Sequence, residues 1–216
     1  MRRLLPFLVL LFPVALGAAG EAAPADFTFR VRRANATIHL ETDGGPLVRR
    51  LVISFSAFHL PAQVIECEGG AENSMDIDPA HPDRVFESAD YDEDGYNDFS
   101  VLDASGTAVN HIRHFFFYHP GRHQFVRRRD FDESGVADYD PSTGIFSRYW
   151  RGGPTAGGAS YRFQHGRLVL LRTVQKAGAE SFRDILPHAS ELDTYIVTTV
   201  YLPGGRIRRF YSREGP

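Results

Sequence analysis

Residues 90–98 are the most constraining stretch of this 216-residue chain, because they form an acidic run with glycine at its sixth position. Counted from Asp90, carboxylates fall at positions 1, 3, 5 and 9, which suits a loop that winds around a hard divalent cation. Gly95 suits the sharp turn of such a loop, since it has no side chain to obstruct it. Carboxylates this close repel one another unless a cation neutralises them, so the run predicts a metal loop whose folding is coupled to metal binding.

The predicted ion is calcium, held by four carboxylates and one main-chain carbonyl. The predicted ligands are Asp90, Asp92, Asp94, Tyr96 through its carbonyl, and Asp98. An EF-hand has a bidentate glutamate at position 12 and helices on both sides, whereas here position 12 is Val101 and both flanks favour strands. We therefore expect a structural calcium between two strands. The alternative is a polar Asp, Asn and Gly turn that is acidic without binding metal.

A related pattern begins at Asp130 and ends at Asp138. Its positions that correspond to the first loop are Asp130, Asp132, Ser134, Val136 and Asp138. Ser134 stands where the first loop has Asp94, which lowers the charge available to a cation. The repeat predicts either a second, weaker calcium site or an acidic loop that copies the geometry without metal.

The N-terminus reads as an export signal. A basic start at residues 1–3 precedes an apolar run over 4–16 and small residues over 17–25. We expect residues 1–20 to be a signal peptide and the mature protein to be periplasmic. No later segment is apolar enough to span a bilayer, and Cys67 is the only cysteine and lies far from the cut. We therefore expect no membrane anchor and no intrachain disulfide.

Nearly every periodic segment after the signal alternates apolar and polar residues, which predicts strands. The expected strands are 27–32, 37–41, 47–55, 85–90, 98–102, 113–118, 125–129, 145–150, 161–165, 168–174, 195–202 and 207–212. Only 177–192 shows weak helical character. The predicted fold is all-β and mostly antiparallel, with a propeller-blade-like module and an additional N-terminal β segment.

Three regions follow the predicted signal peptide. Residues 24–60 form the N-terminal β segment, and residues 61–82 contain three prolines and read as a linker or long loop. Residues 83–216 form the calcium-binding β module.

The chemistry of the chain favours binding over catalysis. The chain has 24 basic and 27 acidic residues, a net charge of −3, and this gives no support for a nucleic-acid partner. No nucleophile has a base and an orienting acid beside it in a recognisable motif, so we expect no enzyme.

Cys67 lies in an acidic segment that should raise its pKa. His111, His114, His119 and His123 lack a nearby carboxylate or cysteine to complete a zinc or copper site, and we expect exposed hairpin side chains.

A glycine-rich stretch between two aromatic strands is the candidate partner-binding loop. Its residues are Arg151, Gly152, Gly153, Gly157, Gly158, Ser160 and Tyr161. Arginine and tyrosine are enriched at interface hot spots, and a slim glycine-rich backbone could enter a partner's cleft. The alternative is a flexible hairpin, with Trp150 and Tyr161 packed in the core.

Over residues 83–175 the chain resembles a family of periplasmic bacterial immunity proteins that are similar to lysozyme inhibitors. The motifs that carry the resemblance are the loop 90–99, Phe125, Asp138-Tyr139-Asp140-Pro141, the run 145–151 and Tyr161-Arg162-Phe163. The resemblance implies a single-propeller-blade-like β protein with bound calcium, which protects its owner from secreted peptidoglycan hydrolase effectors. It also implies that the loop between Trp150 and Tyr161 plugs the hydrolase cleft.

Two functions of different class are therefore expected. The first is a calcium-stabilised periplasmic inhibitor that blocks a lysozyme-like, peptidoglycan-degrading enzyme by inserting a loop into its active site. The second is a calcium-dependent extracytoplasmic β module that binds carbohydrate or a surface and has no inhibitory activity.

Overall fold

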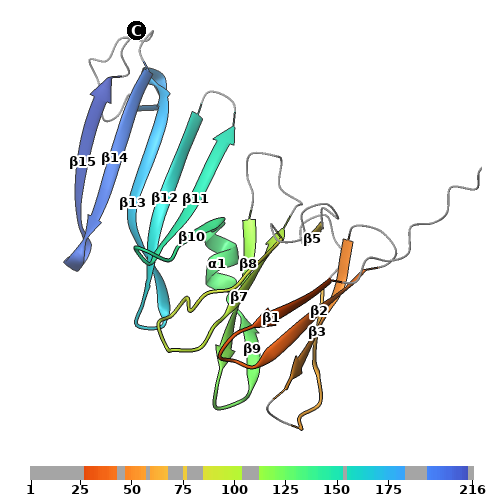
Figure 1. Cartoon of the computed structure of the whole chain (residues 1–216). Coiled ribbons are helices and arrows are strands. Elements are labelled where there is room, and N and C mark those ends of the chain that lie inside the picture. The colour runs from red at the N-terminus through yellow and green to blue at the C-terminus, as the bar shows by residue number, and fades with distance from the viewer. Residues whose placement is uncertain are drawn as a thin grey trace, which may run out of the picture.

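Three antiparallel sheets, called here sheets A, B and C in chain order, make up the molecule (Figure 1). The computed structural model describes residues 27–42, 47–56, 59–67, 75–76, 85–103, 112–152, 155–182 and 194–213. The prediction of an all-β, mostly antiparallel fold is confirmed.

Sheet A is formed by the N-terminal part of the chain. Its strands are β1 (Phe27–Val31), β2 (Ala36–Thr42), β3 (Leu47–Phe55), β4 (Gln63–Glu66) and β5 (Met75–Asp76). Alternate residues of β2 and β3 are fully buried, namely Ile38, Leu40, Leu51 and Ile53. Side chains alternate between the two faces of a strand, so this period-two pattern gives sheet A one apolar face.

Sheet B is a four-stranded meander in the order β6-β7-β8-β9, which is the strand arrangement of one propeller blade. Its strands are β6 (Phe86–Glu87), β7 (Phe99–Asp103), β8 (Ile112–His119) and β9 (Gln124–Arg127). Six consecutive residues of β8 are buried, so this strand is covered on both faces. Phe116 and Tyr118 belong to the core shared with sheet A, whereas Phe115 and Phe117 belong to a second core on the other face.

Sheets A and B share one continuous core. The rings of Phe29 and Phe86 stack with centroids 4.4 Å apart. The side-chain amide of Gln63 donates to the carbonyl of Phe125 at 2.7 Å and accepts from its N–H at 2.8 Å, so β4 joins the edge of β9. The segment expected as a linker, 61–82, thus contains β4 and β5, and both strands pair with β3. It does not separate two cores, because the apolar faces on either side of it pack together.

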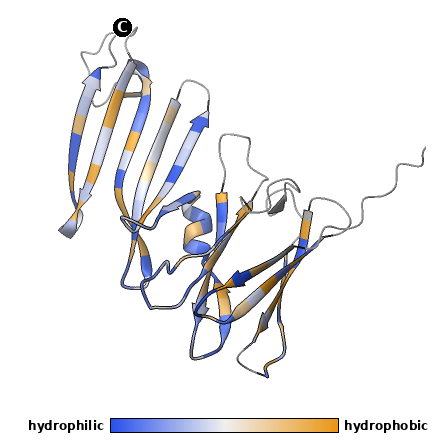
Figure 2. Cartoon of the chain, in the orientation of Figure 1, coloured by the Kyte–Doolittle hydropathy of each residue, from blue (hydrophilic) through white to orange (hydrophobic). Residues whose placement is uncertain are grey.

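Sheet C is a six-stranded meander whose strands follow one another in chain order. Its strands are β10 (Asp138–Asp140), β11 (Ile145–Gly152), β12 (Thr155–Gln164), β13 (Arg167–Gly178), β14 (Thr194–Leu202) and β15 (Arg206–Arg213). Figure 1 shows that this sheet extends well beyond sheets A and B. Figure 2 shows hydrophobic and hydrophilic residues alternating along its strands.

A second core joins the base of sheet C to sheet B. The short helix α1 (Arg129–Ser134) lies between the two sheets and buries Phe131. The centroid of the Phe131 ring lies 4.8 Å from that of Phe115 on β8 and 4.9 Å from that of Phe146 on β11. Strand periodicity did not predict this helix. It is six residues long, too short for a 3.6-residue pattern to emerge.

Weak helical character is expected at 177–192, and the described part of that range holds a 3-10 turn, η2 (Ala179–Phe182), directly after β13. Residues 183–192 lie outside the described residues. A second 3-10 turn, η3 (Pro203–Gly205), joins β14 to β15. The predicted signal peptide at 1–20 lies outside the described residues. Within the described ranges, no helix has the length and apolar character needed to cross a membrane.

Replacing Phe131 by alanine should lower the free energy of unfolding by about 3–5 kcal/mol, because a fully buried ring is removed and its surroundings relax only partly. Chemical denaturation followed by circular dichroism measures this change. Phe210→Ala is the matched control, since that ring is 56% exposed and its removal should leave stability nearly unchanged. Equal losses from the two variants would contradict the proposed core.

Candidate functional site

The acidic loop between β6 and β7 gathers three carboxylates. Oxygen atoms of Asp90, Asp92 and Asp98 all lie within 4.8 Å of one another. Gly95 has a φ of 92°, and its N–H donates to Asp90 Oδ2 at 2.9 Å, so the main chain closes over the first carboxylate. An L-residue would be strained at that φ, which explains the glycine at position 6. Among the described residues this is the one group of acidic, histidine or cysteine side chains arranged so that it could hold a metal ion.

Asp98 is fully buried and ties the loop to sheet B. Its Oδ2 accepts from the N–H of Tyr91 at 2.9 Å, and its Oδ1 accepts from the N–H of Tyr118 on β8 at 2.8 Å. Burial raises the pKa of Asp98 to about 8, and the charge of Asp92 adds to the rise, while the two N–H donors oppose it. Burial and the charge of Asp94 also raise the pKa of Asp92. A cation at this point would reverse the effect by stabilising the ionised forms.

The loop fits a hard cation with oxygen ligands. Asp90 Oδ1 is buried and has no hydrogen-bond partner in the described part of the chain. Buried polar atoms are nearly always satisfied, so this oxygen is oriented for a ligand. Three carboxylates with one uncommitted buried oxygen match the chemistry of calcium better than that of softer metals, which favour sulfur or nitrogen ligands.

One predicted side-chain ligand, Asp94, lies outside this group, and binding through the main-chain carbonyl of Tyr96 stays a prediction. The side chain of Asp94 is exposed, and its Oδ1 accepts from the N–H of Tyr96 at 2.8 Å. The exposed ring of Tyr96 lies against Tyr118, with centroids 5.3 Å apart. Sequence reasoning also missed Arg33, whose Nη1 donates to the carbonyl of Gly95 at 3.3 Å and lies 3.9 Å from Asp90 Oδ2. No local signal could have found this arginine, because it reaches the loop from the turn between β1 and β2.

The acidic repeat at 130–138 folds differently from the first loop. Residues 129–134 form α1, in which Asp130 pairs with Arg128 at 2.8 Å. Asp132 accepts from Arg127 at 2.8 Å and lies 2.9 Å from His114 Nδ1. The expected second set also contains Ser134, Val136 and Asp138; Val136 is fully buried in the second core. Arginine side chains thus pair with two of these carboxylates, and the residues do not repeat the arrangement of the first loop. A second calcium site here stays a prediction.

The histidine and cysteine expectations had mixed outcomes. His114 is buried and bonded to Asp132, so it is not the exposed side chain expected, while His123 pairs with the hydroxyl of Tyr118 at 3.1 Å. His111 lies outside the described residues. The pKa of the Cys67 thiol is raised to about 11, in the expected direction. The main cause is burial rather than the acidic neighbours.

The predicted partner-binding loop is mostly strand. Arg151 and Gly152 end β11, while Gly157, Gly158, Ser160 and Tyr161 belong to β12; Gly153 lies outside the described residues. Trp150 pairs with Gly157 across the hairpin, and a Cβ at Gly157 would lie 2.4 Å from the indole of Trp150. The glycine run therefore makes room for an aromatic side chain rather than for a flexible loop. Tyr161 packs against the second core, as the alternative interpretation expected.

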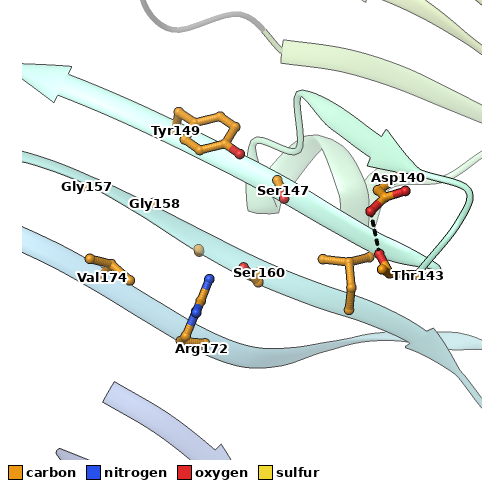
Figure 3. Close-up of a pocket in the computed structure, with 11 residues that line it drawn as sticks. Asp140, Thr143, Ser147, Tyr149, Gly157, Gly158, Ser160, Arg172 and Val174 are labelled. Carbon is orange, nitrogen blue, oxygen red and sulfur yellow. Dashed lines mark hydrogen bonds between the residues drawn. The ribbon is translucent and has the colours of Figure 1, made fainter. Parts of the chain in front are cut away.

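Sheet C holds a shallow trough of about 480 Å³ on the face opposite Trp150 (Figure 3). Paired residues share one face of an antiparallel sheet, so Ser147, Ser160 and Arg172 form one row and Tyr149, Gly158 and Val174 the next. Further residues that line the trough are Asp140, Thr143, Ile145, Gly157 and Ala159. Tyr149 is 57% exposed, and its ring lies across Gly158. Three of the predicted partner-binding residues, Gly157, Gly158 and Ser160, thus line a surface that Tyr149 and Arg172 complete.

No family model matches the sequence, and no curated protein matches it. A solved structure, described as that of a Xanthomonas type IV secretion system related protein, has the same fold. The match has a TM-score of 0.55 and 10% sequence identity, and it covers 87% of this chain and 97% of that chain. At this identity the similarity shows a shared fold alone.

Gly157→Ala should destabilise the distal hairpin by about 1–3 kcal/mol, because the new methyl group collides with the indole of Trp150 and the carbonyl of Val174. Trp150 is the only tryptophan, so its fluorescence reports directly on the displaced ring during denaturation. Gly152→Ala is the control, since a Cβ there meets no atom within 4 Å. Identical spectra and stabilities for the two variants would contradict the packing described.

Proposed function

We propose that this chain is an extracytoplasmic inhibitor or immunity protein that binds a lysozyme-like, peptidoglycan-degrading enzyme, and that calcium in the acidic loop stabilises its binding-competent form. The observation that carries the proposal is the projection of the β11–β12 hairpin, with its trough, beyond the packed base of sheet C (Figure 1). The solved structure with the same fold is described as secretion-system related, which supports a role connected with secretion and says nothing of inhibition.

An exposed arginine at the end of β11 supports insertion of this hairpin into a hydrolase cleft. Arg151 and Gly152 are exposed at the end of β11, so the tip combines a guanidinium group with a slim backbone. Glycoside hydrolases place carboxylates on both sides of the bond that they cleave. Arg151 could pair with such a carboxylate, since arginine forms bidentate hydrogen bonds with carboxylates. A hairpin inserted in this way would exclude the glycan strand without any chemical step.

The trough supplies a second contact area beside the hairpin. Tyr149 offers an exposed ring, and Arg172 offers a guanidinium group for which the described part of the chain shows no ion pair. Tyrosine and arginine are the residue types that dominate interface energetics when a partner covers them. We infer that the partner contacts the hairpin end and the trough together.

Calcium would act through Tyr91. This residue lies between two of the acidic ligands, yet it is buried in the second core. Its ring lies 4.9 Å from Tyr139 of β10 and 5.9 Å from Phe146 of β11, so the loop contributes a side chain to the base of sheet C. A cation held by Asp90, Asp92 and Asp98 would hold the loop closed and keep Tyr91 in this position.

A second candidate function is carbohydrate binding by the trough itself. An exposed aromatic ring beside the hydroxyl groups of Ser147, Thr143 and Ser160 provides a stacking surface with hydrogen-bond donors and acceptors nearby. In that case the protein would bind glycan without protecting it from hydrolysis.

Calcium should raise the melting temperature and chelation should lower it. A ligand at one hundred times its dissociation constant stabilises by about 2.7 kcal/mol. The calcium-induced shift should disappear in Asp90→Ala, which removes a proposed ligand, and persist in Asp130→Ala, which removes an ion pair of the acidic repeat. Differential scanning calorimetry of each variant with and without calcium measures the shift. If Asp90→Ala kept the calcium-induced rise in melting temperature, the proposed calcium site in the acidic loop would be contradicted.

Inhibition is tested by mixing the purified protein with lysozyme-like enzymes and following the turbidity of a cell-wall suspension. We expect protection, and we expect Arg151→Ala and Tyr149→Ala each to weaken it by about tenfold or more, as for interface hot spots. Arg167→Ala is the control, because this exposed arginine begins β13 away from the hairpin end. Retention on peptidoglycan without protection would instead favour the carbohydrate-binding function.

A further inference from the structure

The last strand, β15, is an exposed edge with an unusual composition. It pairs with β14 through all of its residues, and no other described strand pairs with its opposite side. All eight of its residues are exposed. The outer side of β15 therefore presents a row of main-chain N–H and C=O groups, which is a template for another strand.

The side chains of β15 combine positive charge with large apolar groups on both faces. Four of the eight residues are arginine. Because side chains alternate, Arg206, Arg208 and Phe210 lie on one face, and Ile207, Arg209 and Tyr211 lie on the other. Ile207, Phe210 and Tyr211 are 50%, 56% and 42% exposed.

Three of the four arginines of β15 are available to a partner. Within the described ranges, Arg206, Arg208 and Arg209 take part in no ion pair or hydrogen bond of their side chains. One face of β15 continues the surface that bears the trough, since Arg208 pairs with Val200, which in turn pairs with Arg172. The positive charge thus extends from β13 to the edge of the sheet.

We propose that β15 is a docking edge for an acidic, extended segment of a partner protein, which adds to sheet C as a further antiparallel or parallel strand. Main-chain hydrogen bonds would supply affinity, and carboxylates opposite Arg206, Arg208 and Arg209 would supply specificity. This interaction surface is separate from the hairpin end and does not require the proposed inhibitory function or the metal.

Charge decides between an acidic partner and a second copy of this chain. Pairing β15 with β15 of another copy would bring arginine-rich strands together, and like charges on adjacent strands are destabilising. Arginine alone would suffice to prevent such self-pairing. The exposed side chains of Ile207, Phe210 and Tyr211 would oppose that protection, because apolar groups favour association. With an acidic partner strand, the same side chains would provide apolar contacts on both faces.

The test uses the full chain and a fluorescent eight-residue peptide, Val-Glu-Glu-Val-Val-Glu-Glu-Val, which places glutamate and valine on both faces of an added strand. Two control peptides replace either the glutamates with lysine or two central valines with proline, which cannot continue a strand ladder. Fluorescence anisotropy should show the acidic peptide binding at least about tenfold more tightly than either control, with the affinity falling as salt increases. Amide hydrogen exchange over 206–213 should slow when the acidic peptide is added.

The variant for this test is the double substitution Arg208→Glu and Arg209→Glu, which should weaken peptide binding by about tenfold or more. Arg30→Glu with Arg32→Glu makes the same charge change on exposed residues of the β1–β2 hairpin and should leave binding within about twofold of the unmodified protein. Phe210→Ala should also weaken binding, since it removes an apolar contact without unfolding the core.

Three outcomes would overturn the proposal. The first is equal binding of the acidic and proline-containing peptides, and the second is binding without slower exchange over 206–213; either would mean attraction to a charged surface rather than strand addition. The third is absence of acidic-peptide binding together with dimerisation of the Arg208→Glu, Arg209→Glu variant, measured by light scattering. That result would mean that the arginines only prevent self-association. None of these results depends on whether the protein inhibits a hydrolase.

Discussion

The hydrogen bonds that Asp98 accepts from the N–H groups of Tyr91 and Tyr118 connect the acidic loop to the centre of the molecule. A buried carboxylate is costly unless donors or a cation compensate for the lost hydration. Here two main-chain donors, Tyr91 in the loop and Tyr118 on β8, provide part of that compensation. Tyr91, which follows Asp90, is thereby positioned in the aromatic core beneath sheet C. The conformation of the loop and the packing of sheet C on sheet B are consequently coupled through Tyr91.

Sheet B is the central layer, because sheet A packs on one of its faces and α1 with the base of sheet C packs on the other. Its strand β8 has aromatic side chains on both faces, so one face packs on sheet A and the other on α1 and sheet C. Arg128 adds a cation–π contact at 4.6 Å over Phe163 and donates to the carbonyl of Gly166 at 2.9 Å, which fixes the β12–β13 turn. The base of sheet C therefore packs against both α1 and sheet B, while its distal strands carry the exposed end of β11, the trough and the exposed strand β15.

The two acidic repeats show how similar sequences diverge when their surroundings differ. In both, carboxylates recur at alternate positions. In the first, no basic side chain neutralises Asp92 or Asp98 in the described part of the chain, and Asp90 has only the distant guanidinium of Arg33. In the second, Arg127 and Arg128 precede the run and pair with Asp132 and Asp130. The adjacent arginines were readable from the sequence, but their pairing depends on α1, whose formation follows from burying Phe131 between two sheets.

Most of the strands, their antiparallel pairing and the position of the acidic loop could be predicted from the sequence, because these depend on local alternation and on the spacing of carboxylates within nine residues. Even so, the same local signal could not assign β4 and β5 to sheet A, since they are short and defined by pairing with β3. Tertiary structure alone decided that the glycines at 157 and 158 accommodate Trp150 and Tyr149, that Arg33 reaches the acidic loop, and that β15 lies at an edge. Each of these depends on which strands become neighbours, and that is settled by the packing of apolar faces between segments far apart in the chain.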